Sequence, residues 1–277
     1  MRHMVSRYFN IWLAFFRNTL SRDMEFKMNF IFEIFIDAIY YGSLFFFFKI
    51  IFQFTDSLGC FDESAAVIFL ITMYIADSLY VFLLGGNVFN INENVKSGDL
   101  DFILLKPINS QFFISCRYVN THAIIQMIIL FLLLIKLTYT YHGNSFLMMN
   151  YLFYIPSLVL GMFIFYSFEF MISSLVFWLR NFSYAGWLAG ELIKYSRRPD
   201  SIYKRWFQKT LFSIFPMAMI CSVPSRILLW GIENTNAGID LSGLQLFGLQ
   251  AFIAIICLWG TTLIWKAGLK RYESASS

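Results

Sequence analysis

The chain has 277 residues, of which 58% are hydrophobic and 14% are charged. A soluble domain carries roughly a quarter charged residues, so this composition excludes an ordinary soluble enzyme and indicates a multipass membrane protein. The net charge of +4 suits the lipid-facing ends of helices better than nucleic-acid binding. The four cysteines and three histidines are scattered and lack the spacing of a metal site.

Residues 1–27 predict an amphipathic helix rather than a signal peptide. A signal peptide has a short basic head and a single apolar core of about 7–15 residues. Here apolar residues recur at helical spacing and polar residues occupy the opposite side. The apolar set is Val5, Tyr8, Phe9, Trp12 and Phe16, and the polar set is Arg7, Asn10, Arg17 and Ser21. We expect this helix to lie in the membrane interface and to enter the first span at an elbow.

Long apolar runs follow, each able to cross about 30 Å of hydrocarbon as a helix. Spans are expected near 28–52, 64–86, 112–136, 150–179 and 244–266, with a sixth within 181–230. The predicted fold class is therefore an all-α membrane protein with six transmembrane helices.

The distribution of basic residues predicts the orientation, because lysine and arginine gather on the cytoplasmic side of membrane proteins. Residues 1–27 are rich in them, whereas the loop 54–63 has only acidic charges. The C-terminus is again basic, with Lys266, Lys270 and Arg271. Both termini are expected in the cytoplasm, which requires an even number of spans.

The segment Asn87–Pro107 is a polar island between two apolar runs, and it predicts a short amphipathic helix on the cytoplasmic surface. Its first apolar residues, Val88, Ile91 and Val95, share one face, and Gly98 is a stop signal. Asp99 and Asp101 follow, and the apolar residues Leu100, Phe102, Leu104 and Leu105 lead back toward the next span. Such a helix is expected to contact a soluble partner.

Residues 194–209 leave two topologies open, because they carry six basic residues. Their charge places them inside and makes 210–230 the fifth span. The alternative is a short fifth span at 182–196, followed by a re-entrant outer hairpin at 203–230 that Pro216 and Pro224 interrupt. Irregular backbone at membrane depth is tolerated where other parts of the protein bury it.

Three segments, in order along the chain, carry a family resemblance. VKSGDLDFILLKPI (Val95–Ile108) is similar to a Gly-x-Leu-Asp…Leu-x-(Lys/Arg)-Pro signature, and the segment Arg197–Leu229 is similar to a proline- and tryptophan-containing stretch before the last span. WKAGLKRYESASS (Trp265–Ser277) is similar to a basic Trp-x-x-Gly-Leu tail. Together they resemble the permease subunits of type 2 ABC transporters. Lys204 departs from the pattern, since a proline is expected there.

The resemblance implies one transmembrane domain over 1–277 that works as an exporter in a bacterial cytoplasmic membrane. It implies two ABC ATPase subunits, which bind ATP and Mg²⁺, a second permease that is identical or paralogous, and surrounding membrane lipids, with no nucleic acid. Residues 87–107 are then the coupling segment, and 203–230 the outer re-entrant hairpin. The chain has no Gly-x-x-x-x-Gly-Lys-(Ser/Thr) loop, so no enzymatic activity is expected in it. The implied ATPase-coupling residues are Val88, Ile91, Val95, Gly98, Asp99, Leu100, Asp101, Lys106 and Pro107.

Carboxylates within the apolar runs are candidates for a substrate path, because an ionisable side chain in a span costs a few kcal/mol. Asp37, Asp77 and Glu169 each lie about nine residues from the cytoplasmic end of a span, roughly 14 Å above the inner surface. The full candidate set is Glu33, Asp37, Asp77, Glu169 and Glu191. A belt of carboxylates can bind a cationic substrate or relay protons. The alternative is structural, with each carboxylate bonded to a neighbouring helix.

Two other functions compete with the exporter. A membrane-embedded lipid-modifying enzyme needs clustered catalytic residues, and the sequence suggests one such cluster, Glu33 with Asp37, which has no histidine or lysine beside it along the chain. A proton-coupled secondary transporter would use the acidic belt and is expected to show inverted repeats, which the sequence lacks.

Overall fold

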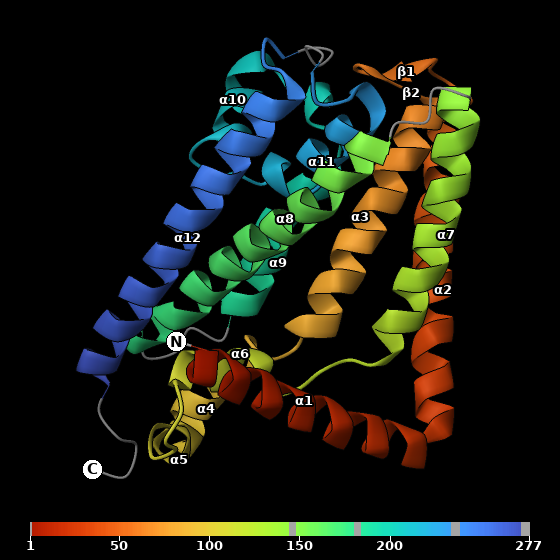
Figure 1. The fold of residues 1–277 in the computed structure, drawn as a ribbon. Helices are drawn as coiled ribbons and strands as arrows, with labels where there is room; N and C mark the ends of the chain where they lie inside the picture. Colours follow the sequence, from red (N-terminus) through yellow and green to blue (C-terminus); the bar gives the residue numbers. More distant parts are fainter. Residues whose placement is uncertain (1, 144–147, 180–183, 234–238, 273–277) are drawn as a thin grey trace.

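The computed structural model describes residues 2–143, 148–179, 184–233 and 239–272 (Figure 1). Within these residues, five helices are long and apolar enough to cross a membrane: α2, α3, α7, α8 with its η2 extension, and α12. The elements in chain order are α1 (Arg2–Glu25), α2 (Lys27–Phe52), β1 (Ser57–Leu58), β2 (Phe61–Asp62), α3 (Glu63–Leu83), α4 (Asn90–Ser97), α5 (Asp99–Leu104), α6 (Ser110–Cys116), α7 (His122–His142), α8 (Met148–Ser174), η2 (Leu175–Phe177), α9 (Ala185–Ile193), η3 (Lys194–Arg197), η4 (Asp200–Ile202), α10 (Arg205–Phe212), α11 (Ala218–Trp230) and α12 (Gly243–Arg271). The chain is thus an all-α multipass membrane protein.

Helix α3 forms the centre of the bundle, and it packs against α7, α8 and α11. Most of its side chains are buried, whereas α2 and α12 expose apolar side chains along much of their length. This outward apolar surface suits lipid or another membrane subunit. The starts of α3 and α12 are fixed by caps, because Asp62 accepts from the Ala65 amide and Ser242 forms a capping box with Gln245.

The two ends of the bundle differ. At one end, the β1–β2 hairpin joins α2 to α3 in antiparallel register, and α10 and α11 lie at the same end of the bundle (Figure 1). At the other end, α1 runs across the bundle below α3 and α7, and α4 and α5 lie beyond the ends of α3 and α8 (Figure 1). We refer to these as the strand end and the α1 end.

Helix α1 is packed by its aromatic side chains. The rings of Trp12 and Phe16 meet Phe82 edge-on at 6.1 and 6.3 Å between centroids, and Phe15 meets Phe113 at 5.6 Å. The helix predicted over residues 1–27 is therefore present, and its aromatic side contacts the end of α3 and α6. Helix α2 begins directly after it, at an elbow around Phe26.

The expected span over 112–136 is broken in the structure. Helix α6 ends at Cys116 and the long helix α7 spans His122–His142, so the span begins ten residues later and ends six residues later than predicted. The side chain of Asn87 accepts from the Tyr118 amide at 2.7 Å and donates to the Tyr118 carbonyl at 2.6 Å. Because these bonds satisfy the backbone between the helices, the helix can stop there.

The region expected to hold a sixth span contains short helices. Of the residues described between 184 and 230, none forms a helix longer than α11, which has 13 residues. Helix η4 reaches the strand end, where the Ser201 hydroxyl donates to the Leu58 carbonyl at 3.2 Å. Helix α11 crosses α8 closely, since a Cβ placed on Gly161 would lie 2.6 Å from the Ile220 carbonyl oxygen.

A buried ion pair joins these short elements. Arg226 on α11 and Asp200 on η4 are both fully buried, and the guanidinium donates to the carboxylate at 3.1 and 2.8 Å. Gln208 on α10 donates to the same carboxylate at 2.6 Å. Asp200 therefore binds three short elements to one another through charge-assisted hydrogen bonds.

Candidate functional site

The polar island forms two short helices with a glycine between them. Helix α4 ends at Gly98, whose φ of 80° is left-handed, and α5 begins at Asp99. The predicted stop at Gly98 is confirmed, because this backbone conformation favours glycine. The second helix was not expected, since Leu100 to Leu105 were predicted to lead directly toward the next span.

The apolar face of the island is turned into the protein. Val88, Ile91 and Leu100 are fully buried, and Val95 is half-buried. Helix α4 contacts the end of α8 and η2, and α5 contacts α6. These apolar residues therefore hold the island on its own chain, and a partner would have to use the opposite side.

The opposite side carries exposed aromatic, aliphatic and charged groups. The exposed fraction is 68% for Phe102 and 82% for Leu105, while Asp99, Lys106 and Pro107 are also exposed. Asp101 is half-buried. We call Asp99, Phe102, Leu105, Lys106 and Pro107 the distal face. An apolar group this exposed at a projecting tip is typical of an interaction site. Neither Phe102 nor Leu105 was among the residues predicted for coupling.

The distal face is held by both ends of the chain. The Arg7 guanidinium on α1 donates to the Pro107 carbonyl at 2.7 Å, and the Tyr8 hydroxyl accepts from the Asn109 amide at 3.2 Å. At the end of α12, the Trp265 indole donates to the Ser110 hydroxyl at 3.2 Å. Hydrogen bonds thus connect Pro107 and the residues that follow it to α1 and α12.

Tyr272 adds a contact between the C-terminus and α5. Its ring lies 6.0 Å from that of Phe177, which in turn lies 5.3 Å from the Trp265 ring. Burial and the neighbouring Asp101 raise the pKa of Tyr272 to about 12, so its hydroxyl is neutral at physiological pH. Asp101 therefore faces the last helix, whereas Asp99 faces outward.

Three of the five candidate carboxylates line one cavity of about 380 Å³. Asp77 on α3, Glu169 on α8 and Glu191 on α9 surround it, together with the cations Lys194 and Arg197. The Arg197 guanidinium donates to Asp77 at 3.1 Å and to the Tyr40 hydroxyl at 2.7 Å. Lys194 bonds Glu191 at 2.5 Å. The cavity is thus a mixed-charge site rather than a purely acidic one.

Glu169 differs from its two neighbours. It is 1% exposed, and its Oε2 atom has no hydrogen-bond partner among the described residues. A buried polar atom without a partner is costly, so the carboxyl group is the strongest candidate in this cavity for contact with a ligand or a proton.

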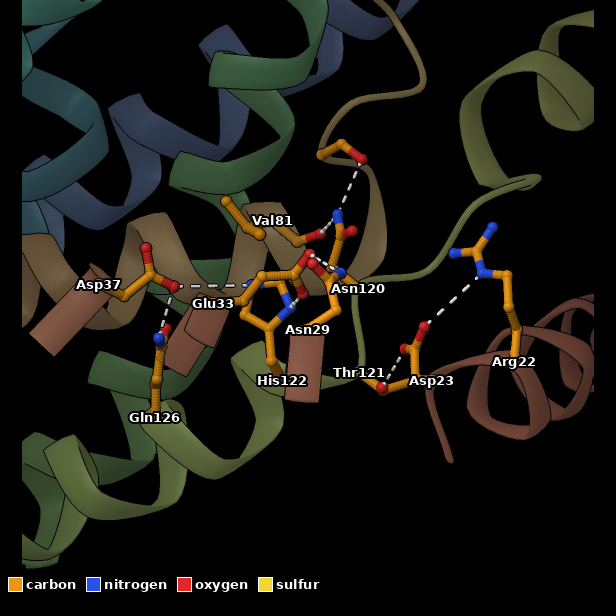
Figure 2. A network of polar contacts seen from close by, with 11 residues as sticks. Arg22, Asp23, Asn29, Glu33, Asp37, Val81, Asn120, Thr121, His122 and Gln126 are labelled. Carbon is orange, nitrogen blue, oxygen red and sulfur yellow. Dashed lines mark hydrogen bonds and ion pairs between the residues drawn. The ribbon is translucent and has the colours of Figure 1, made fainter. Parts of the chain in front are cut away.

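The other two carboxylates belong to a separate cluster, shown in Figure 2. Glu33 Oε2 lies 3.0 Å from His122 Nδ1, and Asp37 Oδ2 lies 3.6 Å from His122 Nε2. Gln126 donates to Asp37 at 2.5 Å and Asn29 donates to Glu33 at 3.1 Å. No histidine lies beside these carboxylates along the chain, but the start of α7 brings His122 between them in the fold.

The cluster extends to the elbow between α1 and α2. Thr121 donates to Asp23 at 2.6 Å, and Arg22 lies 3.7 Å from the same carboxylate (Figure 2). A polar cavity of about 370 Å³ lies among Arg22, Asp23, Glu33 and His122. Among the described residues, no set of three or more His, Cys, Asp and Glu side chains is arranged to hold a metal ion. The cluster therefore connects α1, α2 and α7 by hydrogen bonds.

Comparison with protein families assigns the chain. A family model described as ABC-2 family transporter protein matches residues 38–276. The chain belongs to the ABC-2 transporter family. Comparisons with curated proteins and with solved structures gave no match.

The match covers most features of this ABC-2 chain that are described above. It includes the distal face, the mixed-charge cavity, the Asp200–Arg226 pair and Trp265. Helix α1 and Glu33 lie outside the matched residues. The resemblance seen in the sequence is thereby confirmed at the level of the family, and this chain is a permease component of a membrane transporter.

The Arg197–Asp77 pair is expected to stabilise this ABC-2 permease. Replacing Asp77 with Asn leaves the half-buried guanidinium with the Tyr40 hydroxyl and a neutral amide, and we expect a loss of about 2 kcal/mol in the free energy of unfolding. Thermal unfolding in detergent measures this loss. Glu191→Gln is the matched control, because the Glu191–Lys194 pair is largely exposed and its loss should cost less than about 1 kcal/mol. Equal effects of the two substitutions would contradict this ranking.

His122 is expected to hold α2 against α7 in the ABC-2 fold. His122→Leu removes the partner that Glu33 and Asp37 share, and we expect a loss on the order of 1 kcal/mol because both carboxylates are partly exposed. Adding Glu33→Gln should restore part of the stability, since it removes one of two neighbouring negative charges. A second substitution that destabilises the His122→Leu protein further would show that the histidine does not balance these charges.

Proposed function

We propose that the chain is the membrane-spanning subunit of an ATP-driven exporter, and that ATP is hydrolysed by separate ABC ATPase subunits. The distal face carries this proposal. It presents an exposed phenylalanine and leucine between an aspartate and a lysine, on α5 and the residues directly after it, beyond the ends of α3 and α8 (Figure 1). Apolar residues ringed by charges are typical of protein–protein contacts. The lack of a phosphate-binding loop in the sequence agrees with a partner that supplies ATP and Mg²⁺.

The attachment of the distal face supports a mechanical role. The buried residues Val88, Ile91 and Leu100 hold the island on the protein. Hydrogen bonds join Pro107 of the distal face to α1, and the nearby Ser110 to α12. Such a unit moves as a rigid body when a bound partner moves. We propose that closure of the ATPase subunits on ATP displaces the distal face, and that the displacement is passed to α1, α8 and α12.

We further propose six membrane crossings, with both termini and the α1 end in the cytoplasm. The fifth crossing would be the short α9–η3–η4 path, and α10 and α11 would form the re-entrant hairpin on the outer side. The contacts of Ser201 with Leu58 and of Asp200 with Arg226 support this, because they join these elements to the strand end. The hairpin between α2 and α3 carries only acidic charges, as outer loops commonly do.

The assembly would contain two permeases, identical or paralogous, and two ATPases in a bacterial cytoplasmic membrane. The exposed apolar side chains of α2, α7 and α12 support it, since they offer surface to both lipid and a second permease. The mixed-charge cavity around Glu169 is the proposed substrate path. Because Arg197 and Lys194 offset two of its three carboxylates, a zwitterionic or amphipathic cargo fits it better than a simple cation.

A second candidate function is proton-coupled transport. One observation favours it: His122 lies between Glu33 and Asp37, and groups of this kind can pass a proton. In that case, transport by the chain in sealed vesicles would follow an imposed pH gradient without ATP.

The test is a mild-detergent purification of the tagged chain from its native membrane, followed by mass spectrometry and reconstitution. The proposal predicts an ATPase subunit in a 1:1 ratio with the permease, and transport that stops when a non-hydrolysable ATP analogue replaces ATP. A chain that purifies without an ATPase and transports on a pH gradient alone would contradict it and support the second candidate.

A further inference from the structure

Three basic residues on and next to α10 have no acidic partner among the described residues. The segment 194–209 carries six basic residues, and two of them are used within the protein, as Lys194 pairs with Glu191 and Arg197 with Asp77. Lys204, Arg205 and Lys209 are exposed and belong to no ion pair within the described ranges. Arg205 and Lys209 are four residues apart on α10, so they share one face.

That face borders a cavity with a volume of about 770 Å³. Its apolar wall is formed by α12, by Phe168 of α8 and Phe212 of α10, and by loop residues that include Ile214, Pro216 and Ile239. The α12 residues that line it run from Leu246 to Cys257. At 1.5 Å per residue, this stretch is about 16 Å long, which matches one leaflet of a hydrocarbon core about 30 Å thick.

Charged groups line one part of this groove, and we call that part its mouth. Arg205 and Lys209 supply two positive charges, and Asp240 supplies one negative charge. Gln208 also borders the groove, but its amide is bonded to the buried Asp200. The mouth thus has a net positive charge. Trp206, next to Arg205, has an exposed fraction of 68%, and exposed tryptophan is typical of the membrane–water interface.

We propose that this groove binds an anionic phospholipid, with one acyl chain along α12 and the headgroup phosphate on Arg205 and Lys209. The apolar wall suits an acyl chain, and the length of that wall matches a lipid that occupies a single leaflet. The positive charge of the mouth suits the negatively charged headgroup. Assignment to the outer leaflet rests on the proposed topology, whereas the site itself does not. Bound lipid would also explain why basic residues can remain on the outer side, against the general rule.

The test measures lipid binding to the purified permease, or to its complex with the ATPase where the two co-purify, by native mass spectrometry. The probes are phosphatidylglycerol and, as a neutral lipid, phosphatidylcholine of the same chain length. We expect preferential binding of phosphatidylglycerol. Because one basic residue adds about fivefold to the affinity for an anionic lipid, the R205Q/K209Q variant should weaken that binding about 25-fold.

Two variants keep the test specific. Lys204→Gln removes an exposed charge that does not line the groove, and it should leave the affinity within about twofold of wild type. Ile253→Trp fills the apolar wall and should exclude both lipids, while thermal unfolding without added lipid shows that the protein remains folded. Equal binding of the two lipids, or unchanged phosphatidylglycerol affinity in R205Q/K209Q, would overturn the proposal. Full displacement of the lipid by inorganic phosphate would also overturn it, since the acyl chain would then contribute nothing.

The leaflet and the ATPase are tested separately from the site. A cysteine placed at Thr210 should react with a membrane-impermeant maleimide added to the outside of intact cells. Lipid binding without outside labelling would support the lipid site and contradict the proposed topology. Outside labelling with equal binding of the two lipids would contradict the lipid site and support the proposed topology. Neither result depends on whether an ATPase binds the distal face.

Discussion

Replacing Phe102 with Asp is expected to uncouple ATP hydrolysis from transport while leaving the protein folded in the membrane. The side chain is 68% exposed, so its loss removes little from the core of the chain itself. In a complex, an exposed aromatic residue at the centre of a contact contributes at least about 2 kcal/mol, and a buried, unpaired carboxylate adds a further penalty. We expect substrate-stimulated ATPase activity of the reconstituted complex to fall about 30-fold or more.

The structure provides two matched comparisons for this substitution. Phe54 is 84% exposed at the strand end, so Phe54→Asp makes the same chemical change far from the distal face and should leave ATPase stimulation unchanged. Leu100 is fully buried, so Leu100→Ala should lower the stability of the permease by about 2–5 kcal/mol. Wild-type stimulation in a well-expressed Phe102→Asp protein would remove the distal face from the mechanism.

Replacing Asp200 with Asn is expected to destabilise the protein more than either Asp77→Asn or His122→Leu does. The carboxylate accepts two bonds from Arg226 and one from Gln208, and both members of the ion pair are fully buried. The substitution removes the negative charge opposite the buried Arg226 guanidinium, whose other neighbours include Cys60 Sγ at 3.5 Å and the rings of Phe61 and Trp230 at 5.6 and 5.0 Å. Loss of one partner of a buried pair costs about 3–5 kcal/mol.

Thermal unfolding of the purified permease measures this cost. The double variant D200L/R226M should recover much of the lost stability, since it replaces both charges with apolar groups of similar size. If D200L/R226M were as unstable as Asp200→Asn, shape rather than charge would account for the effect. A melting temperature for Asp200→Asn equal to that of wild type would show that the pair is not needed to hold η4, α10 and α11 together.

The long apolar helices could be predicted closely from the sequence. Helices α2, α3 and α12 begin within one residue of the predicted starts at 28, 64 and 244. Hydropathy determines these helices, because a run of about 20 apolar residues has few alternatives in a membrane. The capping residues Asp62 and Ser242 fix their starts locally, and such signals can be read in a sequence.

Breaks set by tertiary contacts could not be predicted in this way. The gap between α6 and α7 depends on Asn87, which lies 31 residues from the Tyr118 backbone that it binds. The division of 184–230 into short helices depends on Asp200, whose partner Arg226 is 26 residues away. Local hydropathy carries no information about such pairs, and charge counting gave two topologies for the same segment.

The candidate sites show the same limit. Periodicity predicted Val88, Ile91 and Val95 on one face of a helix. Ile91 and Val95 lie on α4, whereas Val88 lies in the turn before it, and periodicity could not tell whether that face meets the chain itself or a partner. The burial of Ile91 and the exposure of Phe102 follow from where α8 and η2 lie. Likewise His122 is 89 residues from Glu33 along the chain, and only the packing of α7 on α2 brings them to 3.0 Å.

The most direct test of the proposed mechanism is photo-crosslinking from the distal face. A benzoylphenylalanine at position 102 should form a covalent adduct with an ABC ATPase subunit in intact cells, and the yield should change between ATP-depleted and ATP-loaded states. The same group at position 54 should give no such adduct. An adduct from position 54 but not from position 102, or no ATPase adduct from either, would contradict a coupling role for the distal face.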